Sequence, residues 1–236
     1  MEYKIFPICE NALTIDFGNT ISVELNDKVL QLVDSIKQTN FAGFIETVPA
    51  YSSLTIFYDL ITVRKTFRDF PNAFSAVRDF VETALNNLSK NEKIQPRLVE
   101  IPVCYDEKFA IDLDFVAENS KLSKDEVIKI HTSKEYRVFM IGFLPAFAYL
   151  GEIDERISTP RKTSPRTNIE KGSVGIAGNQ TGIYPLDSPG GWQIIGKTPL
   201  EMFQPKNEQI SLLRTGELVK FYQISLSEFS KLVKIK

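Results

Sequence analysis

The side chains best suited to chemistry gather between Gly142 and Gly196. Thr159-Pro-Arg161 and Ser164-Pro-Arg166 repeat one short pattern, in which a proline precedes an arginine. Because the residue before a proline prefers extended backbone, the repeat predicts a stiff loop that presents two guanidinium groups. Guanidinium groups bind carboxylate or phosphate through paired hydrogen bonds. The alternative is a turn with two solvated surface arginines, and the spacing favours neither interpretation.

A second group of polar residues lies between two glycines further along the chain. Asn179, Gln180 and Thr181 supply two amides and a hydroxyl between Gly178 and Gly182. With free backbone N–H groups beside them, such side chains can polarise a carbonyl or hold an oxyanion. A hairpin turn is the simpler interpretation of the same residues, and the sequence alone favours it. A catalytic role for the three side chains is the competing hypothesis.

The single histidine, His131, follows an apolar helix face. An imidazole titrates near neutrality, so His131 is a candidate general acid or base. A protonated histidine at a helix C-terminus also interacts favourably with the helix dipole. We favour this structural role and keep catalysis as the alternative.

Two aromatic residues are candidates for substrate binding, Tyr184 and the only tryptophan, Trp192. A tryptophan is more often a core anchor than a ligand platform. The turn before it, Ser188-Pro-Gly-Gly191, leaves room for a ligand beside the ring because glycine has no side chain.

The segment Gly191–Thr198 has the letters of a phosphate-binding P-loop, and we reject this interpretation. A P-loop follows a buried strand and opens a helix. Here a turn precedes the segment, its middle residues favour a strand, and Pro199 restricts Thr198 to extended backbone.

The elements that must position these residues follow two patterns. After residue 93, short apolar runs joined by Gly and Pro turns predict a closed or nearly closed β-barrel. The runs lie at 99–105, 136–143, 174–176, 183–184, 192–195 and 218–224. Two short helices are expected after the first strand, the second opened by a capping box from Ser123 to Glu126. A second capping box, Ser225–Glu228, predicts a C-terminal helix with Phe229, Leu232 and Val233 inward.

The first 92 residues predict the order strand, helix, strand, strand, helix. The strands lie at 13–17, 44–48 and 53–58, and Asn26 or Asp27 is expected to cap the first helix. Asn72 is expected to open the second helix. The order indicates a two-layer α+β unit of ferredoxin-like character. A polar, charged segment that ends at Pro96 separates this unit, residues 1–92, from the barrel, residues 93–236.

Composition limits the class of protein. The 236 residues are 43% hydrophobic and 25% charged, with a net charge of −2, which is ordinary for a globular protein and disfavours nucleic-acid binding. No apolar run approaches the roughly 20 residues that span a bilayer, and the first residues lack the pattern of a signal peptide. Two distant cysteines, Cys9 and Cys104, indicate a reduced cytoplasmic protein. One histidine makes a zinc site improbable, so we expect no metal.

Seven motifs resemble those of the B subunit of 5-oxoprolinase, whose family is also described as allophanate hydrolase subunit 1. They are Val48–Leu54, Gly142–Gly151, Thr159–Arg161, Pro165–Arg166, Gly172–Gly178, Gln180–Pro185 and Ser188–Gly196. The same family includes an inhibitor of a sporulation sensor histidine kinase, and it is similar to half of the carboxyltransferase domain of urea carboxylase. The similarity covers essentially the whole chain. Ala146 departs from the family pattern, in which glycine is expected.

The resemblance implies a ferredoxin-like N-terminal domain and a cyclophilin-like β-barrel C-terminal domain. It also implies that the chain works with the C subunit of 5-oxoprolinase, which has a related architecture, and with the A subunit. Together they open the lactam of 5-oxoproline to glutamate at the expense of ATP, which the assembly is expected to bind. On this interpretation Arg161 or Arg166 binds the substrate carboxylate, the Asn179–Thr181 segment orients the amide, and His131 moves a proton.

Two alternatives accompany this interpretation. A non-enzymatic inhibitor of a histidine kinase would need an exposed apolar patch able to dock on a helix bundle. A member of a urea or allophanate pathway would need a biotin-carrying partner, because this chain has no Met-Lys-Met attachment site.

Overall fold

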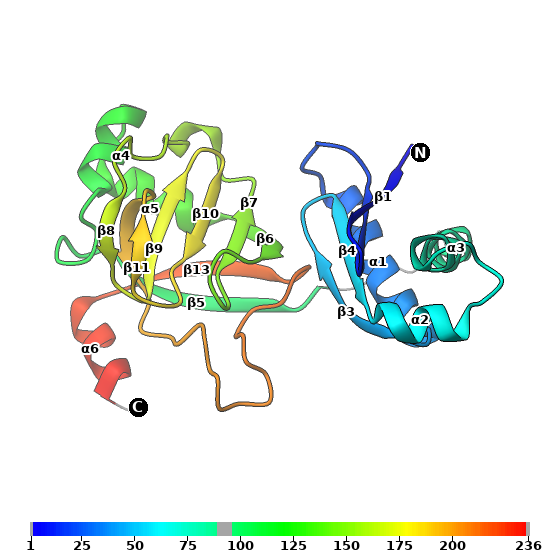
Figure 1. Cartoon of the computed structure of the whole chain (residues 1–236). Coiled ribbons are helices and arrows are strands. Elements are labelled where there is room, and N and C mark those ends of the chain that lie inside the picture. The colour runs from blue at the N-terminus through cyan, green and yellow to red at the C-terminus, as the bar shows by residue number, and fades with distance from the viewer. Residues whose placement is uncertain (1, 89–95, 235–236) are drawn as a thin grey trace. The chain divides into compact units, whose positions relative to one another are not determined.

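A computed structural model describes residues 2–88 and 96–234 and divides the chain into two compact units, Met1–Gln95 and Pro96–Lys236 (Figure 1). The predicted boundary between residues 92 and 93 lies outside the described residues. The predicted α+β class, with a two-layer unit followed by a barrel, is confirmed. No helix of residues 2–88 and 96–234 is long and apolar enough to cross a membrane.

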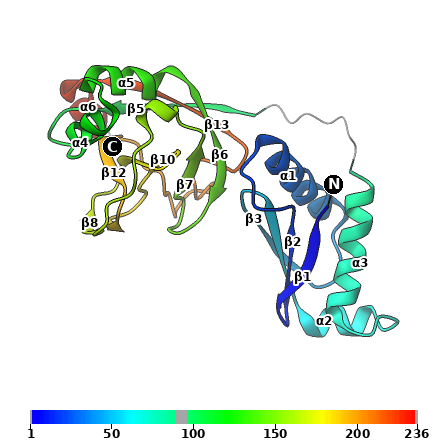
Figure 2. The ribbon, with the colours of Figure 1, turned by 90° about the horizontal axis from the view of Figure 1, so that it is seen from above.

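The first unit is an antiparallel sheet covered by helices (Figure 2). Its strands lie in the order β1 (Lys4–Cys9), β2 (Ala12–Asp16), β4 (Ser53–Tyr58) and β3 (Phe44–Pro49). The helices are α1 (Val23–Thr39), α2 (Leu60–Thr66) and α3 (Ala73–Asn86). Leu13, Ile15, Leu54 and Ile56 are buried with the apolar faces of α1 and α3 in a single core. Because side chains alternate along a strand, this pattern directs every second residue of β4 into the core.

Helix starts test the predicted caps. The expected cap of α1 at Asn26 or Asp27 is wrong, because Ser22 precedes the helix and its Oγ accepts from Leu25 N at 3.1 Å. Asn26 instead lies buried inside the helix, where its amide donates to the Ala50 carbonyl at 3.3 Å. The cap at Asn72 is confirmed by a hydrogen bond of 2.8 Å from Ser75 N to Asn72 Oδ1.

Two elements of this unit, β1 and α2, were not predicted from the sequence. β1 contains a proline, which is tolerated because the strand lies at the edge of the sheet. α2 has seven residues and is opened by Asp59, whose Oδ1 accepts from Thr62 N at 2.7 Å. Neither element has enough apolar periodicity for a confident assignment from sequence.

The second unit is a closed β-barrel, as predicted, and it has seven strands. In order around the barrel they are β10 (Gln180–Ile183), β7 (Ala148–Gly151), β6 (Glu135–Ile141), β13 (Leu218–Ile224), β5 (Leu98–Cys104), β12 (Gln193–Lys197) and β9 (Ser173–Ala177). A separate ribbon pairs β8 (Arg166–Ile169) with β11 (Ser188–Gly190). Val138, Leu150, Ile176 and Phe221 are among the fully buried residues of the barrel core.

Helices α4 (Leu113–Ser120), α5 (Lys124–Ser133) and α6 (Leu226–Lys234) and the 3-10 turn η1 (Glu155–Ile157) complete this unit. Both predicted capping boxes are confirmed, at Ser123 with Glu126 and at Ser225 with Glu228. In α6 the prediction holds only for Phe229, which packs on Phe109 with ring centroids 4.6 Å apart. Leu232 and Val233 are 37% and 48% exposed. Their prediction as inward residues is wrong, because among residues 226–233 only Phe229 is buried, against Cys104, Ile224 and Phe109.

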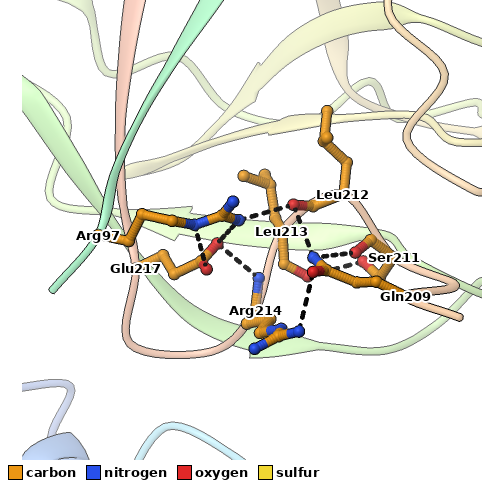
Figure 3. A network of polar contacts seen from close by, with 7 residues as sticks. All are labelled: Arg97, Gln209, Ser211, Leu212, Leu213, Arg214 and Glu217. Atoms are coloured by element: carbon orange, nitrogen blue, oxygen red, sulfur yellow. Dashed lines mark hydrogen bonds and ion pairs between the residues drawn. The ribbon is translucent and has the colours of Figure 1, made fainter.

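A polar network fixes the long connection from β12 to β13 (Figure 3). Arg97 donates to both oxygens of Glu217, at 2.8 and 2.9 Å, and also to the carbonyl of Leu212 at 3.0 Å. The backbone N–H of Arg214 donates to the same carboxylate at 2.9 Å, and its guanidinium donates to Gln209 at 2.8 Å. The network therefore joins the start of β5 to the connection that leads into β13.

Replacing Arg97 with Met is expected to lower the free energy of unfolding of the barrel by about 1–2 kcal/mol, because the mostly buried Glu217 carboxylate loses its charged donors. Trp192 is the only tryptophan, so its fluorescence during urea unfolding reports on the barrel unit. Arg156→Met is the matched control, since Arg156 also pairs with a carboxylate, Asp154, but at an exposed position. Equal midpoints for both variants would show that the network does not stabilise the barrel.

Candidate functional site

The loop that carries the two arginines is attached to β12 and β9 through its backbone. Lys162 N donates to the Gly191 carbonyl at 2.7 Å, and the Gln193 amide donates to the Pro160 carbonyl at 2.9 Å. Gly178 N donates to the Thr159 carbonyl at 2.7 Å. The backbone is therefore held on both sides of residue 161, which gives the predicted stiff loop a physical basis.

A buried carboxylate that was not among the predicted site residues holds the side chains of this loop. Asp112 is 4% exposed and accepts from both terminal nitrogens of Arg166, at 2.8 and 2.6 Å. It also accepts from Lys162 Nζ at 3.2 Å and from Ile194 N at 2.7 Å. Burial raises the pKa of Asp112, but the hydrogen bonds from Arg166 and Ile194 N–H outweigh it and hold the pKa below its ordinary value.

One signal in the sequence points to this carboxylate. The segment 159–169 contains Arg161, Lys162 and Arg166 but no acidic residue, so a buried cation there needs a carboxylate from another part of the chain. Three other aspartates of this unit are engaged elsewhere. Asp114 and Asp154 pair at the surface with Lys124 and Arg156, and Asp187 accepts from Lys171 N at 2.7 Å.

The two arginines differ in their surroundings. The interpretation as a solvated surface residue is wrong for Arg166, because its guanidinium is committed to Asp112 and its side chain is mostly buried. Arg161 is exposed, and its guanidinium has no ion pair or hydrogen bond with any described residue. Burial raises the pKa of Tyr149 and Tyr184, and the positive charge of Arg161 opposes this larger effect. Arg161 and Tyr184 are thus close enough for this interaction, with no hydrogen bond between them.

Glycine is required beside this pair. A Cβ on Gly190 would collide with the hydroxyl of Tyr184, so only glycine allows the ring to lie there. Burial raises the pKa of Tyr184, and a backbone hydrogen bond from Trp192 and the charge of Arg161 oppose this. The Tyr184 hydroxyl therefore stays protonated at neutral pH and can donate a hydrogen bond.

Buried aromatic rings form a small cluster near Gly191, around Phe147. Phe147 lies at their centre and makes edge-to-face contacts with Tyr149, Tyr184 and Trp192, with ring centroids 4.8, 5.3 and 5.4 Å apart. Trp192 is 6% exposed, which agrees with its interpretation as a core anchor. A Cβ placed on Gly191, the residue before Trp192, would lie 3.9 Å from Arg161 Nε, so the guanidinium is near this turn.

The Asn179–Thr181 segment forms a hairpin, as the sequence favoured. β9 and β10 pair with Ala177 opposite Gln180, which leaves Gly178 and Asn179 at the turn. Asn179 is exposed and accepts from Ser158 Oγ at 2.8 Å, whereas Thr181 is fully buried. Asn179 and Thr181 therefore do not converge on one point, because one side chain is at the exposed turn and the other is in the barrel core.

His131 lies in the barrel core with no exposed surface. Thr181 Oγ1 uses its only proton to donate to Gly175 O at 2.9 Å, so it accepts from His131 Nε2 at 3.0 Å. Nδ1 then accepts from the hydroxyl of Tyr105 at 2.7 Å, and the imidazole stacks on Phe221. Burial lowers the pKa of His131 to about 3, so the imidazole is neutral. The predicted charge interaction with the helix dipole is therefore wrong, because it requires a protonated ring.

The Phe143–Phe147 turn holds backbone strain next to the aromatic cluster around Phe147. Phe143 and Ala146 have φ angles of 71° and 66°, the left-handed region that favours glycine. Gly142 N donates to Phe147 O at 3.0 Å, and Phe147 N donates to Leu144 O at 3.0 Å. The resemblance predicts glycine at the position of Ala146, and a φ angle of 66° explains why glycine suits it. The turn forms with alanine because these hydrogen bonds and the buried Phe147 ring hold it.

Acid should destabilise the protein through His131. Between pH 6.5 and about pH 3 the histidine of the unfolded chain is protonated, whereas the native imidazole stays neutral. The free energy of unfolding therefore falls by about 1.4 kcal/mol for each pH unit of acidification in this window. The chain has one histidine, so its imidazole proton resonance is unambiguous. We expect no titration of that resonance between pH 8 and pH 5. A midpoint near 6.5 would show that the ring reaches solvent.

Ala146→Val is expected to lower the free energy of unfolding by about 1–2 kcal/mol, because a β-branched residue adopts the left-handed region at a high cost. Ala146→Gly should keep the wild-type stability within about 1 kcal/mol, since relief of strain offsets the added chain entropy. Trp192 fluorescence during urea unfolding compares the two. Equal losses in both variants would mean that the φ angle does not limit this position.

Among residues 2–88 and 96–234, no group of three or more His, Cys, Asp or Glu side chains is arranged to hold a metal ion. The P-loop-like segment folds as the barrel strand β12, where a phosphate-binding loop would lead into a helix. Its Lys197 is paired with Glu170. These residues therefore do not fit the phosphates of a nucleotide.

Comparison with known proteins finds relatives of nearly equal length and others that are much longer. The chain is 45% identical to a Bacillus subtilis protein named as the B subunit of 5-oxoprolinase, over 97% of this chain and 96% of the relative. The structure named TTHA0988 superposes with a TM-score of 0.78 at 33% identity, covering 91% of this chain and 40% of that longer chain. A Saccharomyces cerevisiae urea amidolyase is more distant, at 22% identity over 93% of this chain and 13% of its own length.

Residues 3–213 match the family described as the carboxyltransferase domain, subdomain C and D. This match covers most of both units. Relatives from Bacillus subtilis and Haemophilus influenzae that carry the 5-oxoprolinase name match at 45% and 35% identity over more than nine tenths of the chain. The chain belongs to the carboxyltransferase subdomain C and D family, in the group of proteins named as the B subunit of 5-oxoprolinase.

Proposed function

We propose that this chain is one subunit of an ATP-dependent 5-oxoprolinase, which hydrolyses the lactam of 5-oxoproline to glutamate. The observation that carries the proposal is the exposed, unpaired guanidinium of Arg161, on a backbone that hydrogen bonds hold on both sides. The name of the Bacillus subtilis relative supplies the substrate. 5-Oxoproline is a small, flat ring with a carboxylate, so it needs one cation and an apolar surface.

The geometry suggests a division of roles among the residues of this site. Arg161 binds the substrate carboxylate through paired hydrogen bonds. Tyr184 and Trp192 are only 1% and 6% exposed, so they support the turn beside Arg161 from below and do not contact the lactam ring. Arg166 acts indirectly, because its guanidinium is committed to Asp112.

The catalytic groups of the reaction come mainly from the assembly. A lactam is a stable amide, and its carbonyl must be activated before water attacks. Asn179 and Gln180, at the β9–β10 turn, are the residues of this chain that can orient an amide oxygen near a partner surface. His131 and Thr181 support them through the barrel core, since neither side chain has exposed surface.

ATP is bound elsewhere in the complex. The P-loop-like segment is a barrel strand and does not open a helix, as a phosphate-binding loop would. We therefore assign ATP to the partners, the A and C subunits of 5-oxoprolinase, and expect this chain to be inactive alone.

The urea amidolyase relative supports a second candidate, a protein that acts on urea or allophanate. Urea has no carboxylate to pair with Arg161, whereas allophanate has one, so this guanidinium alone does not separate the two candidates. They are separated by comparing 5-oxoproline, urea and allophanate as substrates of the assembled complex.

The proposal is tested by ATP hydrolysis that depends on 5-oxoproline, measured with the A and C subunits in the presence and absence of this chain. We expect turnover only when all three are present. Turnover without this chain, or none with a folded and assembled complex, would contradict the proposal.

Arg161→Gln should raise the KM for 5-oxoproline by about 10- to 100-fold, as expected for the loss of a hydrogen bond between two charged groups. Arg156→Gln is the matched control, because Arg156 is an exposed arginine of the same unit paired with Asp154. It should leave KM unchanged. An unchanged KM in Arg161→Gln would exclude this guanidinium as the carboxylate-binding group.

A further inference from the structure

Asp112 occupies an uncommon place for a buried carboxylate. It immediately precedes α4, yet its side chain makes no capping bond to that helix. Its donors come from β12 and from the arginine-bearing loop instead. Its own backbone N–H donates to Ile194 O at 2.8 Å, while its Oδ2 accepts from Ile194 N at 2.7 Å. Both the backbone and the side chain of Asp112 are therefore hydrogen-bonded to β12, in addition to the bonds of the side chain with the loop.

The charges of the loop show what Asp112 does for its neighbours. Three cations, Arg161, Lys162 and Arg166, lie within six positions, and the segment 159–169 has no acidic residue. Asp112 pairs with the second and third. These two pairs hold the loop against β12 on the C-terminal side of Arg161, next to the hydrogen bond from Lys162 N to Gly191 O. Within the described residues, Arg161 is the one guanidinium of the loop without a partner.

We infer that Asp112 is a positioning residue for this site: by binding Arg166 and Lys162 against β12, it fixes the backbone of Arg161 and reserves that guanidinium for a carboxylate ligand. The identity of the ligand rests on the proposed function. The positioning itself rests only on the contacts of Asp112, so the two can be tested separately.

Asp112→Asn gives a test in which a role of the charge and a role in positioning predict opposite changes in substrate affinity. The substitution keeps the shape of the side chain and removes one negative charge from a group of three cations. If charge alone governed ligand binding, the more positive site would bind an anionic substrate more tightly. If Asp112 acts by position, the loosened loop binds it more weakly despite the added positive charge.

Two measurements are made on the full chain. Amide hydrogen exchange of Lys162, followed by NMR, reports whether the loop stays bound to Gly191. The KM for 5-oxoproline in the assembled complex reports whether the substrate site is intact. In Asp112→Asn we expect exchange at Lys162 to accelerate by about 10-fold or more, with the amide of Tyr184 in the barrel unchanged. We also expect KM to rise by about 10-fold, with a smaller effect on kcat.

Asp114→Asn is the matched control. It makes the same chemical change two residues later, at an exposed carboxylate that pairs with Lys124. Both measurements should match the wild type. If Asp112→Asn does not fold, Arg166→Gln removes the bidentate pair and leaves Asp112 bound to Ile194 N and Lys162, and it should change both quantities in the same direction by less.

Each outcome decides the inference. Unchanged exchange at Lys162 in a folded Asp112→Asn or Arg166→Gln variant overturns it, whatever the turnover does. Faster exchange with a lower or unchanged KM also overturns it, because charge would then dominate. If the wild-type complex shows no turnover with 5-oxoproline, the proposed function fails, and the exchange measurement alone decides the positioning role.

Discussion

Closure of the barrel is the constraint on which the rest of the C-terminal unit depends. β5 and β13 pair in parallel, from Leu98 opposite Leu218 to Cys104 opposite Ile224, and join the two ends of this unit. Once every strand has a neighbour on both sides, backbone groups of the wall are no longer free to bind a ligand. Recognition must then come from the turns and from loops laid on the outside of the wall. The arginine-bearing loop is such a segment.

Buried polar groups fasten these loops to the wall and give the barrel its internal order. Asp112 joins β12 to the loop, and Glu217 joins the start of β5 to the connection before β13. Inside, His131 links α5 to β10 through Thr181 and to the end of β5 through Tyr105. Each group satisfies several donors or acceptors, which offsets the cost of its burial. Asp112, Glu217 and His131 are ionisable side chains, yet their contacts serve mainly to stabilise the fold.

Structural features that depend on interactions between residues close in the sequence were predictable. The helix caps at Asn72, Ser123 and Ser225 depend on hydrogen bonds across three residues, and the strands of the barrel follow from short apolar runs. The role of His131 depends on Tyr105 and Thr181, 26 and 50 positions away, and spacing along the chain carries no information about them. For the same reason Asp112 escaped notice, since its partner Arg166 lies 54 positions later.

The parallel pairing of β5 with β13 also orders the events of biosynthesis. Leu98 is among the first residues of the barrel unit to leave the ribosome, but its partner Leu218 is made 120 residues later. Loop closure over such a separation is slow, so the edge of β5 that pairs with β13 stays unpaired until β13 has been synthesised. The sheet of the first unit needs only residues up to Tyr58, so it can form while the barrel is still incomplete. A nascent chain halted before residue 218 would therefore expose an open, aggregation-prone wall beside an already folded unit.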